Sequence, residues 1–160
     1  MMKRITVAML VSFVAAPSGA KGPPALRLPE KALAAEHYRY VTKVGELPED
    51  IRLDIASQLE QRQLQMADAG APFNSSDAVV DAALPAHRLI VAALGQTYSV
   101  VHFERGGVAL TRWVVIFERG SVGLNTLWHG VITQTYKEPH ELETAIRTGA
   151  LWKAPSRSAQ

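Results

Sequence analysis

The sequence predicts one α+β domain, in which N-terminal helices and a short C-terminal helix pack on one face of a four-stranded antiparallel meander. Two observations predict this class. Up to about residue 70 the apolar residues recur at helical spacing, and from about His87 onward β-branched and aromatic residues cluster between glycine-containing turns. The 160-residue chain is long enough to bury one apolar core.

The N-terminus has the three-part pattern of a secretory signal. Lys3 and Arg4 give a positive start, residues 5–16 form an apolar run, and small residues follow up to Ala20. A run of about twelve residues is shorter than the roughly twenty that a helix needs to span a membrane. An amphipathic helix is the alternative, but two hydroxyl residues do not make a polar face. We therefore expect cleavage near Ala20 and export, to the periplasm or beyond, with no stable membrane anchor.

The mature protein is expected to comprise a flexible leader at residues 21–28, a domain at residues 29–153 and a flexible tail at residues 154–160. Loss of Lys3 and Arg4 lowers the count of basic residues from 17 to 15, which equals the 15 acidic residues. A neutral domain gives no electrostatic reason to expect binding to nucleic acid. The chain has no cysteine, which excludes disulfides and a lipid-attachment site.

Three segments begin with a proline that suits a helix start, and in the first two an acidic residue follows it directly. The first begins at Pro29 and is expected to reach Val41, and the second begins at Pro48 and is expected to end before Gly70. Pro139 begins the short last helix.

Four strands are expected, at residues 88–94, 97–104, 111–117 and 126–133. If the second connection pairs Arg105 with Arg112, large side chains collect on one face, which we expect to be the helix-covered core. A slip of one residue would exchange the two faces. The expected core face contains Tyr98, Val100, His102, Trp113, Val115, Phe117 and Trp128.

One group of residues is a candidate for catalysis. The same register places His87, His102 and Glu104 on one face, where they could act as a general base or bind a metal, whereas His129 points the other way. A histidine on a strand is more often a structural residue. The chain has no thiolate and no zinc-motif spacing, and Arg119 stands where a nucleophile elbow requires glycine. We therefore expect no metal and no cofactor, and favour a non-enzymatic function.

A short internal repeat offers a second carboxylate. Residues 100–106 and 114–120 both end in Phe-Glu-Arg-Gly. Neighbouring strands of a meander run in opposite directions, so Glu104 and Glu118 are expected at opposite ends of the sheet. The repeat is therefore interpreted as two similar strand ends and not as a pair of catalytic carboxylates.

Aromatic and arginine side chains are the candidate binding residues, because such residues dominate protein interfaces. The first of three possible functions is a small exported protein that binds a protein partner, such as an inhibitor or an immunity-type protein. The second is a small-ligand module with a pocket between sheet and helix, and the third is a small hydrolase that uses the His/Glu cluster. The candidate binding residues are Tyr98, Arg105, Trp113, Arg119 and Trp128.

Overall fold

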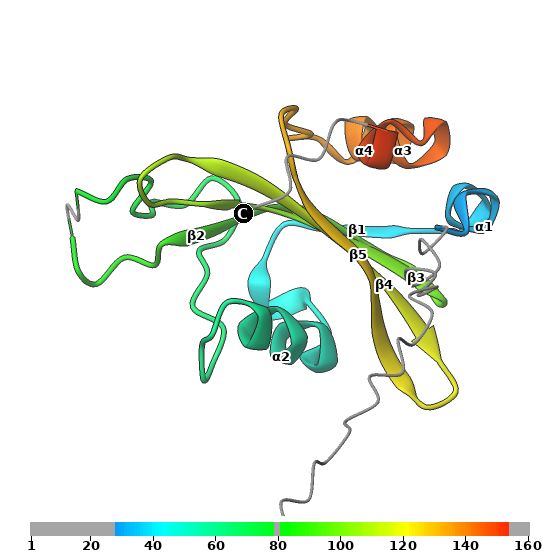
Figure 1. The fold of residues 1–160 in the computed structure, drawn as a ribbon, viewed down its shortest axis with the longest axis horizontal. Coiled ribbons are helices and arrows are strands. Elements are labelled where there is room, and N and C mark those ends of the chain that lie inside the picture. The colour runs from blue at the N-terminus through cyan, green and yellow to red at the C-terminus, as the bar shows by residue number, and fades with distance from the viewer. Residues whose placement is uncertain (1–27, 79–80, 154–160) are drawn as a thin grey trace, which may run out of the picture.

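The protein is built around one antiparallel sheet of five strands in the order β1-β2-β3-β4-β5 (Figure 1). The computed structural model describes residues 28–78 and 81–153, so the predicted signal segment, nearly all of the leader and the tail lie outside the described residues. The strands are Arg39–Val41 (β1), His87–Leu94 (β2), Tyr98–Arg105 (β3), Thr111–Gly120 (β4) and Gly123–Ile132 (β5). The helices are Glu30–Ala35 (α1), Glu49–Gln58 (α2), Pro139–Thr148 (α3) and Ala150–Lys153 (α4), with a 3-10 turn at Val44–Glu46 (η1).

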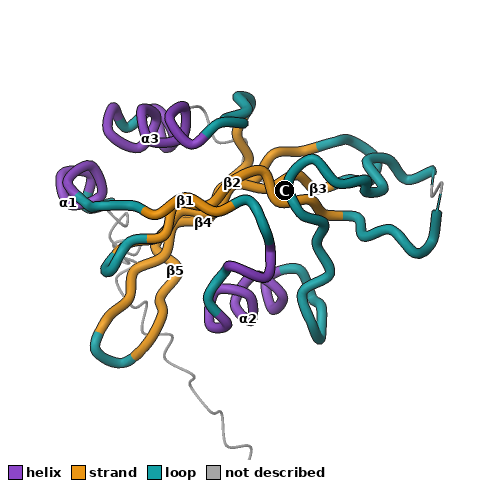
Figure 2. Tube along the Cα trace, turned by 180° about the vertical axis from the view of Figure 1, so that it is seen from behind, coloured by secondary structure: helices purple, strands orange, loops and turns teal. Residues whose placement is uncertain are grey.

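Helices lie on both faces of the sheet (Figures 1 and 2). Leu142 and Ile146 of α3 pack on one side together with α1 and α4, and we call this side the α3 face. Ile51 and Ile55 of α2 pack on the other side, the α2 face. The predicted α+β class and antiparallel sheet are confirmed. Packing on one face holds for α1, α3 and α4, whereas α2, which was predicted to share that face, covers the other one. Within the described residues, no helix is long and apolar enough to cross a membrane.

β1 is a strand that the sequence analysis did not predict. The first helix was expected to reach Val41 but ends at Ala35, and Glu36 follows it with an extended backbone. The Glu36 carboxylate accepts hydrogen bonds from the backbone N–H groups of Gln96 and Thr97, at 3.3 and 3.2 Å. This contact holds the chain against the β2–β3 turn, so that residues 39–41 pair with β2.

β3 and β4 pair one residue away from the predicted register, because Arg105 lies opposite Thr111 and not opposite Arg112. Since side chains alternate along a strand, this slip exchanges the faces of β4, and the predicted single core face is wrong. Both faces of these strands are buried and apolar, so apolar character did not distinguish the two registers. The α3 face receives Tyr98, Val100, His102 and Trp128, and the α2 face receives Trp113, Val115 and Phe117.

A β-bulge at Ile90 changes the pairing of β2 with β3. Before the bulge His87 lies opposite Arg105, and after it Val91 lies opposite His102. The extra residue turns His87 toward the α2 face, while His102 and Glu104 stay on the α3 face. The prediction that His87, His102 and Glu104 share a face is therefore wrong.

Gly106 lies against the backbone of the loop that precedes β2. A Cβ atom added to Gly106 would lie 2.0 Å from the carbonyl oxygen of Asn74, whereas one added to Gly45 would meet nothing within 4 Å. We expect Gly106→Ala to lower the free energy of unfolding by about 2 kcal/mol or more, and Gly45→Ala to change it by less than about 0.5 kcal/mol. Urea unfolding of the two variants measures this difference. Equal stability of the two variants would contradict the close approach at Gly106.

Candidate functional site

His102 is a fully buried histidine whose two ring nitrogens are both occupied. Its Nδ1–H donates to the carbonyl oxygen of Trp113 at 3.0 Å, and its Nε2 accepts from the backbone N–H of Tyr136 at 3.4 Å. Burial lowers the pKa of His102 to about 4. The ring is thus neutral at physiological pH, and it links β3 to the segment before α3 rather than facing a substrate.

His87 lies on the other side of the sheet, buried against the ring of Phe103. Burial, together with the positive charge of Arg105, lowers the pKa of His87. The sheet separates His87, on the α2 face, from His102 and Glu104, on the α3 face. Within the described parts of the chain, no group of three or more His, Asp or Glu side chains is placed to hold a metal ion.

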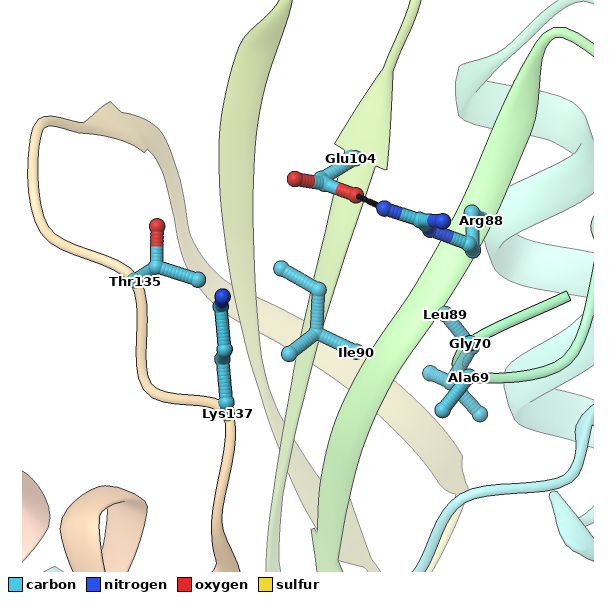
Figure 3. A pocket seen from close by; sticks show the side chains of 8 residues that line it. All are labelled: Ala69, Gly70, Arg88, Leu89, Ile90, Glu104, Thr135 and Lys137. Atoms are coloured by element: carbon cyan, nitrogen blue, oxygen red, sulfur yellow. Dashed lines mark hydrogen bonds and ion pairs between the residues drawn. The ribbon is translucent and has the colours of Figure 1, made fainter. Parts of the chain in front are cut away.

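Glu104 lies at the end of β3 on the α3 face, and its side chain is 8% exposed. Its Oε2 accepts hydrogen bonds from Nε and from the terminal NH2 of Arg88, at 3.0 and 2.6 Å. The Arg88 guanidinium in turn lies over the ring of Phe73, 4.3 Å from its centre. Glu104 also lines a cavity of about 220 Å³, with Thr135 and Lys137 on the opposite wall (Figure 3).

A second cavity lies on the α2 face, between α2 and the sheet, with a volume of about 260 Å³. We call it the Trp113 groove. Its apolar lining comes from both the helix and the strands, and its polar groups lie on β3, β5 and α2. The groove is lined by Ile55, Gln58, Leu59, Phe103, Arg105, Trp113 and His129.

The Trp113 ring is held in place at the rim of this groove. Its Nε1–H donates to Thr111 Oγ1 at 3.0 Å, and the exposed ring of His129 meets it edge-on, with 6.4 Å between the ring centres. The guanidinium of Arg105 is exposed and forms no ion pair with any described carboxylate. The groove therefore combines a fixed aromatic ring with an unpaired positive charge.

Two polar contacts hold α2 against the sheet and so fix the other wall of the groove. Arg119 of β4 forms an ion pair with Asp50, which holds the pKa of that carboxyl below its usual range. Thr126 of β5 donates its hydroxyl to Asp54 at 3.0 Å. Both contacts join α2 to strands of the sheet. The helix and the strands that line the groove are therefore held in a fixed arrangement.

β5 is an edge strand whose outer side pairs with no strand in the described chain. It has ten residues, and none of them is Lys, Arg, Asp, Glu or Pro. A bulge at Leu127 is its one irregularity, whereas the opposite edge strand β1 has three residues and includes the exposed Arg39. Charge, proline, short length and bulges are the usual protection of sheet edges, and of these β5 has only the bulge at Leu127.

The five predicted binding residues have different environments. Arg105 and Trp113 meet in the groove. Tyr98 is buried and its hydroxyl donates to Glu118 at 3.2 Å, while Arg119 is engaged with Asp50. Trp128 lies on the α3 face, where its ring covers Gly130.

Sequence reasoning did not include His129 among the binding residues, nor did it identify the free edge. The run of uncharged residues at 123–132 was the available signal for the edge. The contribution of α2 to the groove had no sequence signal, because it depends on which face the helix covers. Compared with protein-family models, curated proteins and solved structures, the chain matches none of them.

The buried His102 makes stability depend on pH. Its pKa is about 4 in the folded protein and 6.5 in an unfolded chain, so between these values the unfolded chain binds more protons and stability falls as the pH falls. We expect a loss on the order of 3 kcal/mol through this residue as the pH drops across that window. Urea unfolding at several pH values measures it.

The matched variants are His102→Gln, which removes the titrating group, and His129→Gln, which removes an exposed histidine. We expect the first to lose less stability at acid pH than the parent protein, and the second to follow the parent. His87, whose pKa is also lowered, contributes in the same direction in all three proteins. An unchanged pH dependence in His102→Gln would contradict the assignment.

Proposed function

We propose that this chain is a small exported protein that binds a protein partner without catalysis, in the manner of an inhibitor or an immunity-type protein. The observation that carries the proposal is the free, uncharged edge of the ten-residue strand β5. An extended segment of a partner can add to such an edge, because its backbone groups form hydrogen bonds with the unpaired groups of the strand.

The Trp113 groove supports the proposal by providing a place for a partner side chain. A segment lying beside β5 would direct every second side chain toward the α2 face, where His129 of β5 borders the groove. An apolar side chain fits between Trp113 and α2, and an acidic side chain two residues away, on the same face of the segment, would pair with Arg105. We therefore infer an extended partner segment in which a large apolar residue and an acidic residue are separated by one residue.

A prediction and an observation support this function. The predicted signal at residues 1–20 supports action outside the cytoplasm, which all three candidate functions share. The separation of His87 from His102 and Glu104 by the sheet removes the geometric basis of the hydrolase alternative. The small-ligand alternative, a pocket between sheet and helix, would also use the Trp113 groove, but it gives no role to the free edge of β5.

Binding by a captured partner tests the groove. The mature protein is used to capture partners from an envelope extract of its source organism, and the purified partner is then titrated against variants. We expect Trp113→Ala to weaken binding at least about 30-fold and Arg105→Glu at least about 10-fold. Trp152→Ala in α4, on the α3 face, and Arg39→Glu in β1 change the same residue types away from β5 and the groove, and should keep the affinity of the parent protein.

Hydrogen exchange on the same complex tests strand addition. Amide groups of β5 should exchange more slowly when the partner is bound, whereas those of β1 should not change. A partner that binds Trp113→Ala and Arg105→Glu as tightly as the parent, or that leaves exchange at β5 unaltered, would count against the proposal.

A further inference from the structure

A third cavity, of about 370 Å³, is formed by the start of α2, the η1 turn before it and the loop that follows the helix. We call it the Arg52 pocket. It shares no lining residue with the Trp113 groove or with the cavity at Glu104. Its charged and apolar lining residues are Val44, Glu49, Arg52, Leu53, Arg62 and Leu64.

Two arginine side chains in this pocket have no partner. Neither Arg52 nor Arg62 forms an ion pair, a ring contact or a side-chain hydrogen bond with any residue that the structure describes. Arg62 is exposed, but Arg52 is half-buried, and its Nε–H is fully buried without an acceptor. A buried donor without an acceptor has lost its hydration and gained nothing in return. The Arg52 guanidinium therefore lacks an acceptor that the described protein does not supply.

The charge of the pocket is positive. Glu49 lines it as well and precedes Arg52 by three residues on α2, a spacing at which opposite charges can meet, yet the two form no ion pair. Two unpaired guanidinium groups and one carboxylate give a net charge of +1. An anion with a single charge neutralises this excess, whereas an anion with two charges would be repelled by Glu49.

Apolar side chains complete the lining of the pocket. Leu53 is 57% exposed, and few other large apolar side chains in the described chain are as exposed. Val44 and Leu64 beside it are half-buried. A ligand with a hydrocarbon part would remove apolar surface of Leu53 from water, which is favourable. The pocket thus suits a ligand that carries both an anionic group and an apolar group.

The loop wall of the pocket is positioned by an unusual end of α2. The N–H of Gln61 donates to the carbonyl oxygen of Ala56 at 2.8 Å, the pattern of a helix end in which the preceding residue is usually glycine. Here that residue is Glu60, whose φ of 57° is unfavourable for a residue with a side chain. The turn returns the chain so that Arg62 and Leu64 line the pocket with α2. Strained backbone of this kind is typical of functional sites.

Carboxylate is the singly charged anion whose planar geometry matches guanidinium groups. We propose that the Arg52 pocket binds a small aliphatic carboxylate, with the carboxylate group at Arg52 and Arg62 and the hydrocarbon chain over Leu53. The volume of the pocket is in the range of small-molecule sites. This site is separate from β5 and does not depend on the proposed partner binding.

Titration with hexanoate, followed by the amide chemical shifts of the isotope-labelled protein, tests the proposal. Three controls each change one property of the ligand: acetate lacks the chain, hexanamide lacks the charge, and sulfate carries two charges and no chain. We expect hexanoate to bind at least about 10-fold more tightly than each control and to shift the signals of residues 44–64. A preference of less than about 10-fold over any of the three would overturn the proposal.

A variant at the exposed arginine locates the binding. Arg62→Gln removes one guanidinium group from the pocket, and because Arg62 is exposed and unpaired, the fold is not threatened. We expect it to weaken hexanoate binding at least about 10-fold. Arg39→Gln, a change at an exposed arginine of β1, is the matched control and should keep the affinity of the parent protein. Parent affinity in Arg62→Gln, or an equal loss in Arg39→Gln, would refute the site.

Arg52→Met separates a binding role of Arg52 from a structural one. The change keeps an unbranched aliphatic side chain and removes the buried donor that has no acceptor. Hexanoate should bind at least about 10-fold more weakly, while the free energy of unfolding in urea stays at or above that of the parent protein. A clearly lower free energy of unfolding would give Arg52 a structural role and count against the proposal, as would unchanged hexanoate affinity.

Trp113→Ala distinguishes this inference from the proposed function. It changes the groove and not the Arg52 pocket, so hexanoate affinity should equal that of the parent protein, and Arg62→Gln should keep the parent affinity for the protein partner. Loss of hexanoate binding in Trp113→Ala together with its retention in Arg62→Gln would place the ligand in the groove and refute the site at Arg52.

Discussion

The central strand β3 constrains the rest of the structure, because its side chains are buried on both faces. Every residue from Tyr98 to Glu104 is buried, and β3 is the middle strand of the sheet. A strand buried on both sides requires cover on both sides. This requirement explains why α2 and α3 lie on opposite faces, each directing an apolar stripe of Leu or Ile side chains toward the sheet.

The same burial determines how the polar residues of β3 are used. His102 and Glu104 occupy positions where water is excluded, so each needs partners within the protein. His102 obtains them from the backbone of β4 and of Tyr136, and Glu104 obtains them from Arg88. These bonds fix the segment before α3 and the start of β2, which form two walls of the cavity on the α3 face. The hydrogen bonds that satisfy His102 and Glu104 therefore also position the walls of this cavity.

The sequence predicts the secondary structure of this protein better than its pairing. Proline and acidic residues identified the helix starts, and β-branched runs between turns identified the four long strands. β1 is too short to give a pattern, and the bulge at Ile90 has no sequence signal. Strand pairing decides which side chains lie close together. The sequence therefore identified Arg105 and Trp113 as single binding residues but not that they share a groove, and it predicted a cluster around His87 that the structure does not have. A register with two apolar faces cannot be chosen by counting apolar residues.

The unequal edges of the sheet have a consequence for assembly. A sheet with two open edges can join head to tail without limit and form a filament. Here β5 is long and open, but β1 has three residues and is followed at once by the η1 turn. Once a strand of another protein or of a second copy pairs with β5, no second long edge of the sheet remains for further pairing. Strand pairing between these domains therefore ends when the β5 edges are used, and the asymmetry of the two edges disfavours a continuous polymer.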